Sequence, residues 1–342
     1  MLHKREIPTP ALILDLDAFE ANLALMMAQM KRSGKNLRPH AKAHKCVQIA
    51  RRQIAAGAIG VCVATVPEAE VMARAGIAGL LLTSPLADPL KMARAVKTAA
   101  MVTVDHVQQV TWYQEAASAA GKKVDVLVDL DVGDHRTGAS SVKQAIEIAQ
   151  SVEGSANLRL RGIQGYSGRS AHGANAEERK RTSDAAFEIA IKARDAFVLA
   201  GLSTEVLTGG STGTWDIDTL RPEVTEIQAG SFVLMDMEYE RVGVPFRHVL
   251  RVLATVVSAN HDAFVTVDAG FKAISADRGY GPENYRWGGD EFGYFDFADA
   301  KPKLGDRIEF VPPHCDPTVN LHNRIYACRG ENVEGAWPVM DR

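Results

Sequence analysis

The chain has 342 residues, of which 46% are hydrophobic, so it can bury a large core in about two domains. Its formal net charge is -3 and it has no long run of lysine or arginine, which excludes nucleic acid and an anionic membrane as main partners. No stretch approaches the roughly 20 apolar residues of a membrane span. Because the N-terminus lacks a signal-peptide pattern and the four cysteines form no CxxC pair, we expect a cytoplasmic protein.

Strand-like and helix-like segments alternate along the first two thirds of the chain. After an early strand at residues 11–17, the pattern predicts strands at residues 37–45, 60–65, 80–85, 101–105, 124–132, 158–166, 205–209 and 224–232. Helices are predicted at residues 18–31, 46–56, 67–75, 90–98, 107–120, 141–151 and 176–200. Eight strands separated mostly by helices are typical of a TIM barrel, and a doubly wound open sheet is the alternative.

After about residue 245 the pattern changes to short alternating segments that are typical of antiparallel strands, with no helix predicted between them. The predicted fold class is therefore α/β, with a TIM-type (β/α)8 barrel over residues 12–240 and a mainly antiparallel β domain. That second domain is predicted to contain residues 1–11 and 241–342, and the early strand ALILDLD is a further candidate for it. Residues 278–297, rich in glycine and aromatics, are predicted to form a loop with a lid or interface role.

The segment LRPHAKAHK at residues 37–45 is polar and basic, although an apolar strand follows it. If it is a strand, one of its faces carries Arg38, His40, Lys42 and His44. A lysine among cationic and imidazole neighbours is a candidate for a depressed pKa, and a neutral amine is what imine formation with an aldehyde cofactor requires. A basic loop that binds an anion or faces solvent is the alternative.

Other polar residues fall where predicted strands end, which is the catalytic face of a barrel. Arg136, in DVGDHRTG after the fifth strand, is a candidate donor to the pyridine nitrogen of a cofactor, or else a surface partner of Asp134. Tyr166 at the end of the sixth strand belongs either to the core or to the wall of the cofactor site. His172 lies in the loop beyond it, where a solvated side chain is the alternative to a functional one.

Glycine and small hydroxyl residues follow the seventh and eighth strands, where such barrels often bind phosphate. Backbone N–H groups with little steric bulk around them form an anion nest. The candidates for phosphate binding are Gly210, Ser211, Thr212, Gly230 and Ser231. A phosphate site and Lys42 at one barrel mouth fit pyridoxal 5'-phosphate, although a simple turn is the alternative for each loop.

The segment VPPHCDPTVN carries His314 and Asp316 two residues apart. In an extended segment both side chains point to one face, and Cys315 points to the other. An imidazole and a carboxylate form half of a site for Mn²⁺, Mg²⁺, Ca²⁺ or Zn²⁺, which water and substrate would complete. A structural turn is the alternative.

Four motifs together, RPHAKAHK, DVGDHRTG, TGGST and PPHCDPTVNLHNRIYA, resemble the D-threonine aldolase and D-serine dehydratase family. These are fold-type III pyridoxal phosphate enzymes with an alanine-racemase-like barrel and a β domain. The resemblance implies that Lys42 links the cofactor, that Arg136 meets its pyridine nitrogen and that the two small-residue loops surround its phosphate. It also implies a divalent metal on His314 and Asp316 beside the substrate's β-hydroxyl, and a homodimer.

The dehydratases of this family are known for zinc on a His-x-Cys pair, whereas the His-x-Asp pair of this chain resembles the aldolases. The expected activity is cleavage of a D-β-hydroxy-α-amino acid, of the D-threonine type, to glycine and an aldehyde, with His172 as the candidate base. One alternative is a D-3-hydroxyaspartate aldolase that gives glycine and glyoxylate. Another is a dehydratase of D-serine or D-3-hydroxyaspartate that gives a 2-oxo acid and ammonia. A racemase and a cofactor carrier without turnover are the remaining alternatives.

Overall fold

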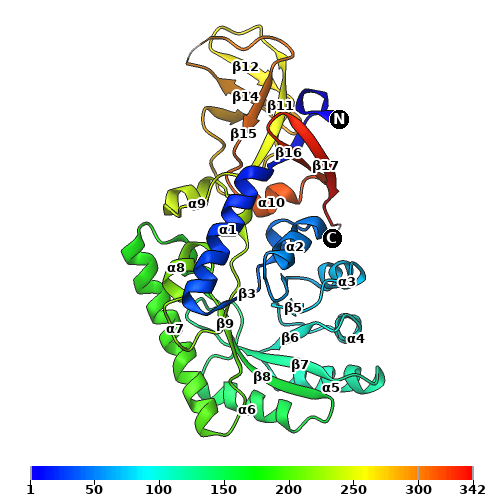
Figure 1. Ribbon diagram of the computed structural model, residues 1–342, viewed down its shortest axis with the longest axis vertical. Coiled ribbons are helices and arrows are strands. Elements are labelled where there is room, and N and C mark those ends of the chain that lie inside the picture. Colours follow the sequence, from blue (N-terminus) through cyan, green and yellow to red (C-terminus); the bar gives the residue numbers. More distant parts are fainter. Residues whose placement is uncertain (1, 299, 341–342) are drawn as a thin grey trace. The chain divides into compact units, whose positions relative to one another are not determined.

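Eight short, apolar, parallel strands form a barrel in the computed structural model, which describes residues 2–298 and 300–340 (Figure 1). In chain order they are β3 (Asn36–Leu37), β4 (Cys62–Val63), β5 (Leu81–Leu82), β6 (Met101–Val104), β7 (Val124–Asp129), β8 (Leu158–Gly165), β9 (Val206–Gly209) and β10 (Glu226–Ile227). A bridge between His40 and Cys62 joins the two ends of this sheet and closes it. The predicted (β/α)8 barrel is therefore confirmed, and the open sheet is excluded.

Helices follow the barrel strands and cover the outside of the sheet (Figure 1). They are α2 (Val47–Ala55), α3 (Val66–Arg74), α4 (Pro89–Lys97), α5 (Val107–Ala119), α6 (Val142–Glu153), α7 (Ala176–Leu199) and α8 (Trp215–Asp218), while α1 (Leu16–Ser33) precedes β3. Several begin at a polar cap, such as Thr65, whose side chain accepts from the backbone N–H of Glu68. Their buried faces have helical spacing, as in α4, where Met92, Ala95 and Val96 are buried.

A second sheet of nine strands is mainly antiparallel. Its strands are β1 (Leu2–His3), β2 (Ala11–Asp15), β11 (Leu250–Ser258), β12 (Phe264–Val267), β13 (Tyr285–Trp287), β14 (Gly293–Asp296), β15 (Arg307–Phe310), β16 (Arg324–Arg329) and β17 (Asn332–Pro338). The early strand β2 lies in the middle of it, antiparallel to β11 and parallel to β16. Two short helices, α9 (Met237–Val242) and α10 (Cys315–Val319), accompany this sheet.

The chain divides into two compact units that are interleaved in sequence. One holds the chain up to Leu25, the segment Ala43–Gln48 and the chain from Ser231 onward. The other, the barrel unit, holds Met26–Lys42 and Ile49–Gly230. The predicted boundaries, at residues 11/12 and 240/241, differ from this division because β2 pairs with strands from the end of the chain. Among the described residues, no helix is long and apolar enough to cross a membrane.

Three local predictions were wrong. The strand predicted at residues 37–45 ends early, since only Asn36–Leu37 is regular strand and Ala41–Ala43 forms a 3-10 helix, η2. The His40 imidazole accepts the backbone N–H of Lys42, and this local bond turns the chain away from the sheet. The unit that contains the mainly antiparallel sheet has the helix α10, where no helix was predicted. Residues 278–297 were predicted to be a loop, but they contain the paired strands β13 and β14.

Candidate active site

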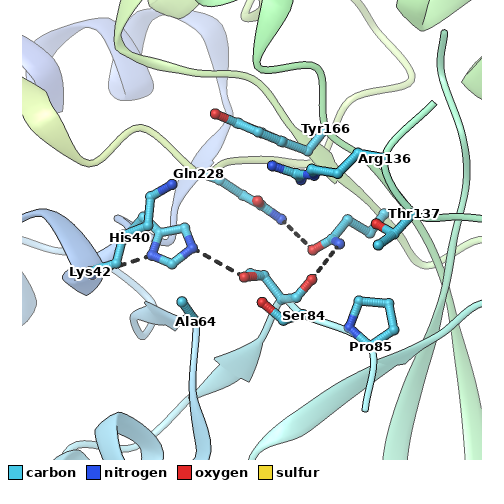
Figure 2. A pocket seen from close by; sticks show the side chains of 11 residues that line it. His40, Lys42, Ala64, Ser84, Pro85, Arg136, Thr137, Tyr166 and Gln228 are labelled. Atoms are coloured by element: carbon cyan, nitrogen blue, oxygen red, sulfur yellow. Dashed lines mark hydrogen bonds between the residues drawn. The ribbon is translucent and has the colours of Figure 1, made fainter. Parts of the chain in front are cut away.

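A cavity of about 270 Å³ lies at the carboxyl ends of the barrel strands. The loops after β3, β4, β5, β7, β8 and β10 contribute its walls (Figure 2). Its lining residues are His40, Lys42, Ala64, Thr83, Ser84, Pro85, Arg136, Thr137, Gln164, Tyr166 and Gln228. Three residues predicted from sequence, Lys42, Arg136 and Tyr166, are thus brought together, at the end of the barrel where catalytic groups are expected.

Lys42 lies on η2 and is half-buried. Its backbone N donates to Nδ1 of His40 over 3.3 Å, and Nε2 of His40 lies 3.1 Å from Oγ1 of Thr83. Thr83 donates its own hydroxyl proton to the carbonyl of Val63, at 3.2 Å. Through these contacts, His40 fixes the start of η2, on which Lys42 lies.

The predicted common face of Arg38, His40, Lys42 and His44 does not exist, because the strand ends before it can form. Only His40 lines the cavity with Lys42. Arg38 is buried in an ion pair with Glu226, with 2.8 Å between Nη2 and Oε2. His44 is fully buried, and its Nδ1 accepts the backbone N–H of Cys46 at 3.1 Å.

The loop that carries Arg136 is closed at its two ends by backbone bonds: Ala139 donates to the carbonyl of Asp129 at 2.9 Å, and its own carbonyl accepts from Asp131 at 3.1 Å. Asp131 accepts the backbone N–H of Gly133 at 2.9 Å, which folds the loop over the strand ends. The Arg136 guanidinium carbon lies 5.4 Å from the centroid of the Tyr166 ring, within the range of a cation–π contact. Figure 2 shows the two side chains next to each other, across the pocket from Lys42.

The alternative partner for Arg136, Asp134, is engaged elsewhere. Its carboxylate accepts from the Ser167 hydroxyl at 2.7 Å and from the Gly168 backbone N–H at 2.6 Å. Within the described residues, no ion pair between Arg136 and Asp134 is found. Asp134 therefore ties the loop after β7 to the loop after β8.

A buried polar network that the sequence analysis missed supports the lining residues. Asp129 accepts from Nε2 of Gln164 and from Oγ1 of Thr137, each at 2.8 Å. Gln228 donates to Oε1 of Gln164 and to Oγ1 of Thr208, each at 3.1 Å. Burial raises the pKa of Asp129 to about 6, although its two hydrogen bonds act in the opposite direction.

Asp129 makes the stability of the protein depend on pH. Its folded-state pKa, about 6, exceeds the ordinary value of 3.8, so the folded state binds more protons at this group between about pH 4 and 6. The free energy of unfolding therefore falls as pH rises through this window, by about 3 kcal/mol for two pKa units. We expect the Asp129→Asn variant to lack this fall, which urea unfolding of both proteins at pH 4.5 and 7 would measure. Identical pH dependence in both proteins would contradict this assignment.

The predicted phosphate loops consist of tightly packed backbone. Ser211 donates its backbone N–H to Oγ1 of Thr214 over 3.1 Å, and both residues are buried. A Cβ on Gly230 would lie 2.7 Å from the carbonyl oxygen of His40, so a larger residue could not pack this closely against the backbone there. Ser231 begins another 3-10 helix, Ser231–Val233, and belongs to the other unit.

His172 is half-buried at the end of the 3-10 helix Arg169–His172 and is not among the described residues that line the cavity. The neighbouring Ala171 packs directly on the loop after β9. A Cβ on Gly213 would lie 1.9 Å from the carbonyl oxygen of Ala171, which makes a side chain there impossible without a shift. His172 is therefore held beside the predicted phosphate loop of residues 210–212.

The predicted metal ligands lie at the start of α10, not in an extended segment. His314 is the residue before the helix, and Asp316 is in its first turn, so the expected strand parity was wrong. Oδ1 of Asp316 lies 3.5 Å from the Ser231 hydroxyl. Among the described residues, no group of three or more His, Cys, Asp or Glu side chains is placed to hold a metal ion.

A carboxylate that the sequence analysis missed fixes the His314 ring. Nδ1 of His314 lies 2.7 Å from Oδ2 of Asp277, and a hydrogen bond from Ser275 at 2.8 Å holds the same carboxylate. Metal-binding imidazoles commonly donate their second N–H to such a carboxylate. This contact leaves Nε2 as the nitrogen that an ion would bind.

The model of the alanine racemase N-terminal domain matches residues 14–260, well over half of the chain. The chain belongs to the alanine racemase-like family. A second model, that of a serine dehydratase domain, matches residues 249–328 of this family member. Enzymes with the alanine racemase-like fold depend on pyridoxal phosphate.

Three relatives match this alanine racemase-like chain along nearly its whole length. A 3-hydroxy-D-aspartate aldolase from Paracoccus denitrificans (strain Pd 1222) is 36% identical, covering 100% of this chain and 94% of the relative. A D-threonine aldolase from an Arthrobacter species is also 36% identical, covering 98% and 93%. The crystal structure of D-threonine aldolase from Filomicrobium marinum superposes with a TM-score of 0.94 at 36% identity, covering 98% of this chain and 95% of that one.

The barrel cavity of this alanine racemase-like chain fits the cofactor of the family. The amine of the half-buried Lys42 can react with the cofactor aldehyde. The Arg136 guanidinium can donate a hydrogen bond to the pyridine nitrogen, and the Tyr166 ring offers an aromatic surface in the same cavity. Gly230, where a Cβ would lie 2.7 Å from the carbonyl oxygen of His40, lets the loop after β10 approach the backbone of that lining residue. The residues present are therefore compatible with pyridoxal phosphate.

Proposed function

We propose that this protein is a pyridoxal phosphate- and divalent-metal-dependent lyase. It cleaves a D-β-hydroxy-α-amino acid of the D-threonine type between Cα and Cβ, and it releases glycine and an aldehyde. The observation that carries the proposal is the convergence of Lys42, Arg136 and Tyr166 on one cavity at the barrel mouth. The identity of 36% to two aldolases over nearly the whole chain supports the same reaction class.

Residues that line the cavity and the loops after β9 and β10 would hold the cofactor together. Lys42, which lines the cavity, would bind its aldehyde carbon, and the loop residues Gly210, Ser211, Thr212, Gly230 and Ser231 would bind its phosphate. Arg136 donates a hydrogen bond to the pyridine nitrogen, and because a guanidinium keeps its protons, that nitrogen stays unprotonated. When bound, pyridoxal phosphate supplies the electron sink for the carbanion left at Cα. Tyr166 restrains the Arg136 side chain through the 5.4 Å cation–π contact.

Two further assignments complete the proposal. His172 removes the proton from the β-hydroxyl of the substrate, which starts the bond cleavage. His314 and Asp316 hold a divalent ion, Mn²⁺, Mg²⁺, Ca²⁺ or Zn²⁺, whose Lewis acidity would lower the pKa of that hydroxyl. A cytoplasmic homodimer remains part of the proposal, and sedimentation of the purified protein tests the dimer.

The Asp277→Asn variant is expected to bind the ion about 10- to 100-fold more weakly, because the contact that orients His314 is lost. Calorimetric titration of metal-free protein with Mn²⁺ measures this change without relying on turnover. The matched control is Asp290→Asn, which removes an exposed carboxylate whose nearest cation, Nζ of Lys272, lies 4.0 Å away. Equal Mn²⁺ affinity in wild type and Asp277→Asn would show that Asp277 does not support a metal site.

The assay that tests the function uses purified protein with pyridoxal phosphate and Mn²⁺, incubated separately with D-threonine, D-3-hydroxyaspartate and D-serine. Glycine with acetaldehyde from D-threonine is the expected result, and glycine with glyoxylate would instead identify D-3-hydroxyaspartate as the substrate. Ammonia with a 2-oxo acid and no glycine would replace the aldolase by the dehydratase. Bound cofactor without turnover of any of these amino acids would favour the carrier.

A further inference from the structure

The barrel has a second cavity, of about 420 Å³, at the end opposite to the one that Lys42 lines. The first residues of strands β6, β7 and β9, namely Met101, Val124 and Val206, contribute to its wall. Five cationic residues line it, and they are Arg38, Lys122, Lys123, Arg159 and Arg161. Asp125 is the one acidic residue among the described residues that line it.

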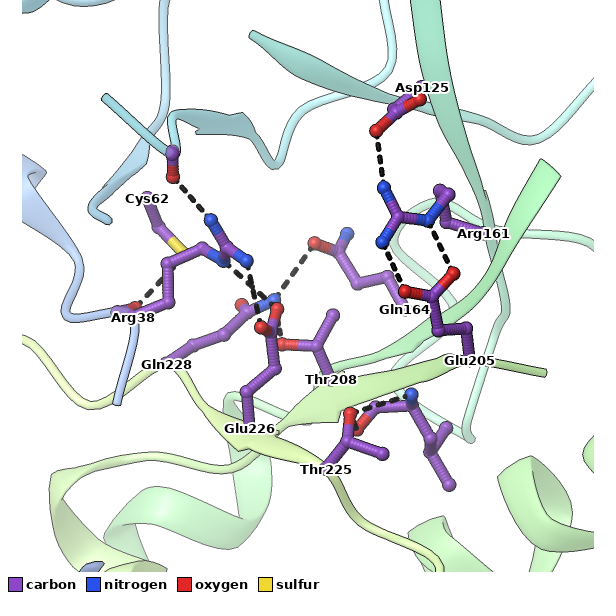
Figure 3. Close-up of polar contacts among 12 residues, drawn as sticks. Arg38, Cys62, Asp125, Arg161, Gln164, Glu205, Thr208, Thr225, Glu226 and Gln228 are labelled. Carbon is purple, nitrogen blue, oxygen red and sulfur yellow. Dashed lines mark hydrogen bonds and ion pairs between the residues drawn. The ribbon is translucent and has the colours of Figure 1, made fainter. Parts of the chain in front are cut away.

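The three arginines are paired with carboxylates in forked geometry, and Figure 3 shows the pairs of Arg38 and Arg161. Arg159 donates to Asp125 at 2.6 and 2.7 Å, and Arg161 donates to Asp125 at 2.5 Å. Arg161 also donates to both oxygens of Glu205, at 2.8 and 2.5 Å. In the interior, Arg38 donates to Glu226 at 3.0 and 2.8 Å. Figure 3 shows Arg38 and Arg161 on separate sides of this part of the barrel.

The two lysines of the cavity, Lys122 and Lys123, differ from the arginines in the partners of their ammonium groups. Lys122 donates its ammonium group to the carbonyl oxygen of Lys97 at 2.9 Å, and a neutral carbonyl leaves its charge uncancelled. For Lys123, no carboxylate partner is found in the part of the chain that the structure describes. The five cations therefore face three carboxylates, Asp125, Glu205 and Glu226, which leaves two positive charges at the cavity.

The ion pairs of the three arginines would be enough to stabilise this end of the barrel. Lys122 and Lys123 are two further exposed cations at the same cavity, and this stabilisation does not require them. Positive charges gathered around a hollow repel one another and concentrate anions from solution. The volume lies within the range of small-molecule sites, about 300–1,000 Å³. The paired arginines already hold fixed orientations, so a bound anion could accept from them without reordering their side chains.

We infer that this cavity is a binding site for a small dianion, either a phosphate monoester or inorganic phosphate, or a dicarboxylate. Two negative charges match the excess of two positive charges at the cavity. Lys122 and Lys123 are the groups that bind the ligand most directly, because the arginines already have carboxylate partners. The inference concerns the end of the barrel opposite to the proposed active site and does not depend on the proposed reaction.

Titration calorimetry with the cofactor-saturated protein tests the inference, with inorganic phosphate in one arm and malonate in the other. Sodium chloride at matched ionic strength serves as the reference. We expect saturable binding of at least one dianion with one site per chain. The Lys122→Gln/Lys123→Gln double variant should weaken it by about tenfold or more, because both uncancelled charges are removed. Phosphate binding alone points to a phosphate ligand, and malonate binding alone points to a dicarboxylate.

The matched control is the Lys180→Gln/Lys192→Gln variant, which removes the same charge from the exposed face of α7. It should bind the dianion as the wild type does, and both double variants should unfold at the wild-type temperature without ligand, since all four lysines are exposed. No saturable binding of either dianion would overturn the inference. Equal weakening in both double variants would overturn it as well, because the effect would then come from net charge alone.

Discussion

The Lys42→Ala variant is expected to lose the visible absorbance of bound pyridoxal phosphate and to lose activity by a factor on the order of 10³ or more. Lys42 is the lysine that lines the barrel-mouth cavity, and His40 fixes the backbone on which it lies. An alanine at this position keeps η2 but removes the amine that the cofactor aldehyde requires. Absorbance spectra of wild type and variant after dialysis, followed by the glycine assay, measure both effects.

Lys45 provides the control, because it is only three residues away in the same basic segment. Its ammonium group donates to Oδ1 of Asn320 at 3.0 Å, and its side chain is buried. We expect the Lys45→Ala variant to keep the cofactor absorbance. If absorbance survives in Lys42→Ala and disappears in Lys45→Ala, the anchor has been assigned to the wrong lysine.

The Glu226→Gln variant is expected to lose about 3–5 kcal/mol of unfolding free energy, since it leaves the Arg38 guanidinium buried without a counter-charge. The two side chains are only 7% and 3% exposed, so water replaces the missing partner poorly. Arg38 also donates to the carbonyl of Gly79, which keeps it from moving out to solvent. Urea unfolding followed by circular dichroism measures the loss.

Two further variants separate charge burial from the loss of an ion pair in general. In Arg38→Met/Glu226→Leu both charges are absent, and most of the lost stability should return. The Arg159→Met variant breaks the ion pair with Asp125, in which the arginine side chain is 56% exposed. Its unfolding free energy should fall by about 1 kcal/mol or less. A loss in Glu226→Gln as small as that in Arg159→Met would mean that Arg38 is hydrated in the folded protein.

The barrel was predictable from the sequence because its strands are buried on both faces. Parallel strands of this kind are short apolar runs, such as GVCVAT. Several of the helices between them begin at polar caps and are followed by a glycine. This local pattern was enough to give the strand count and the end of the barrel where Lys42, Arg136 and Tyr166 lie. The exact end of β3 was not predictable, because it depends on one side-chain bond between His40 and the backbone of Lys42.

The partners of the candidate residues could not be predicted, because they come from distant parts of the chain. Asp277 lies 37 residues before His314, and no periodicity connects the two. Gln228 and Gln164 are 64 residues apart and meet only because β8, β9 and β10 are neighbours in the barrel. Sequence spacing indicates which face a side chain takes, whereas the identity of its partner depends on the register of the folded sheet.

The interleaving of the two units determines the order in which they can be completed during synthesis. The segments of the barrel unit end at Gly230, so all eight of its strands exist before the last hundred or so residues are made. Strand β2, made among the first residues, pairs with β11 and with β16, which ends at Arg329. The N-terminal strand must therefore wait first for β11 and then for β16, and this unit closes last, through contacts of very long sequence separation that form slowly.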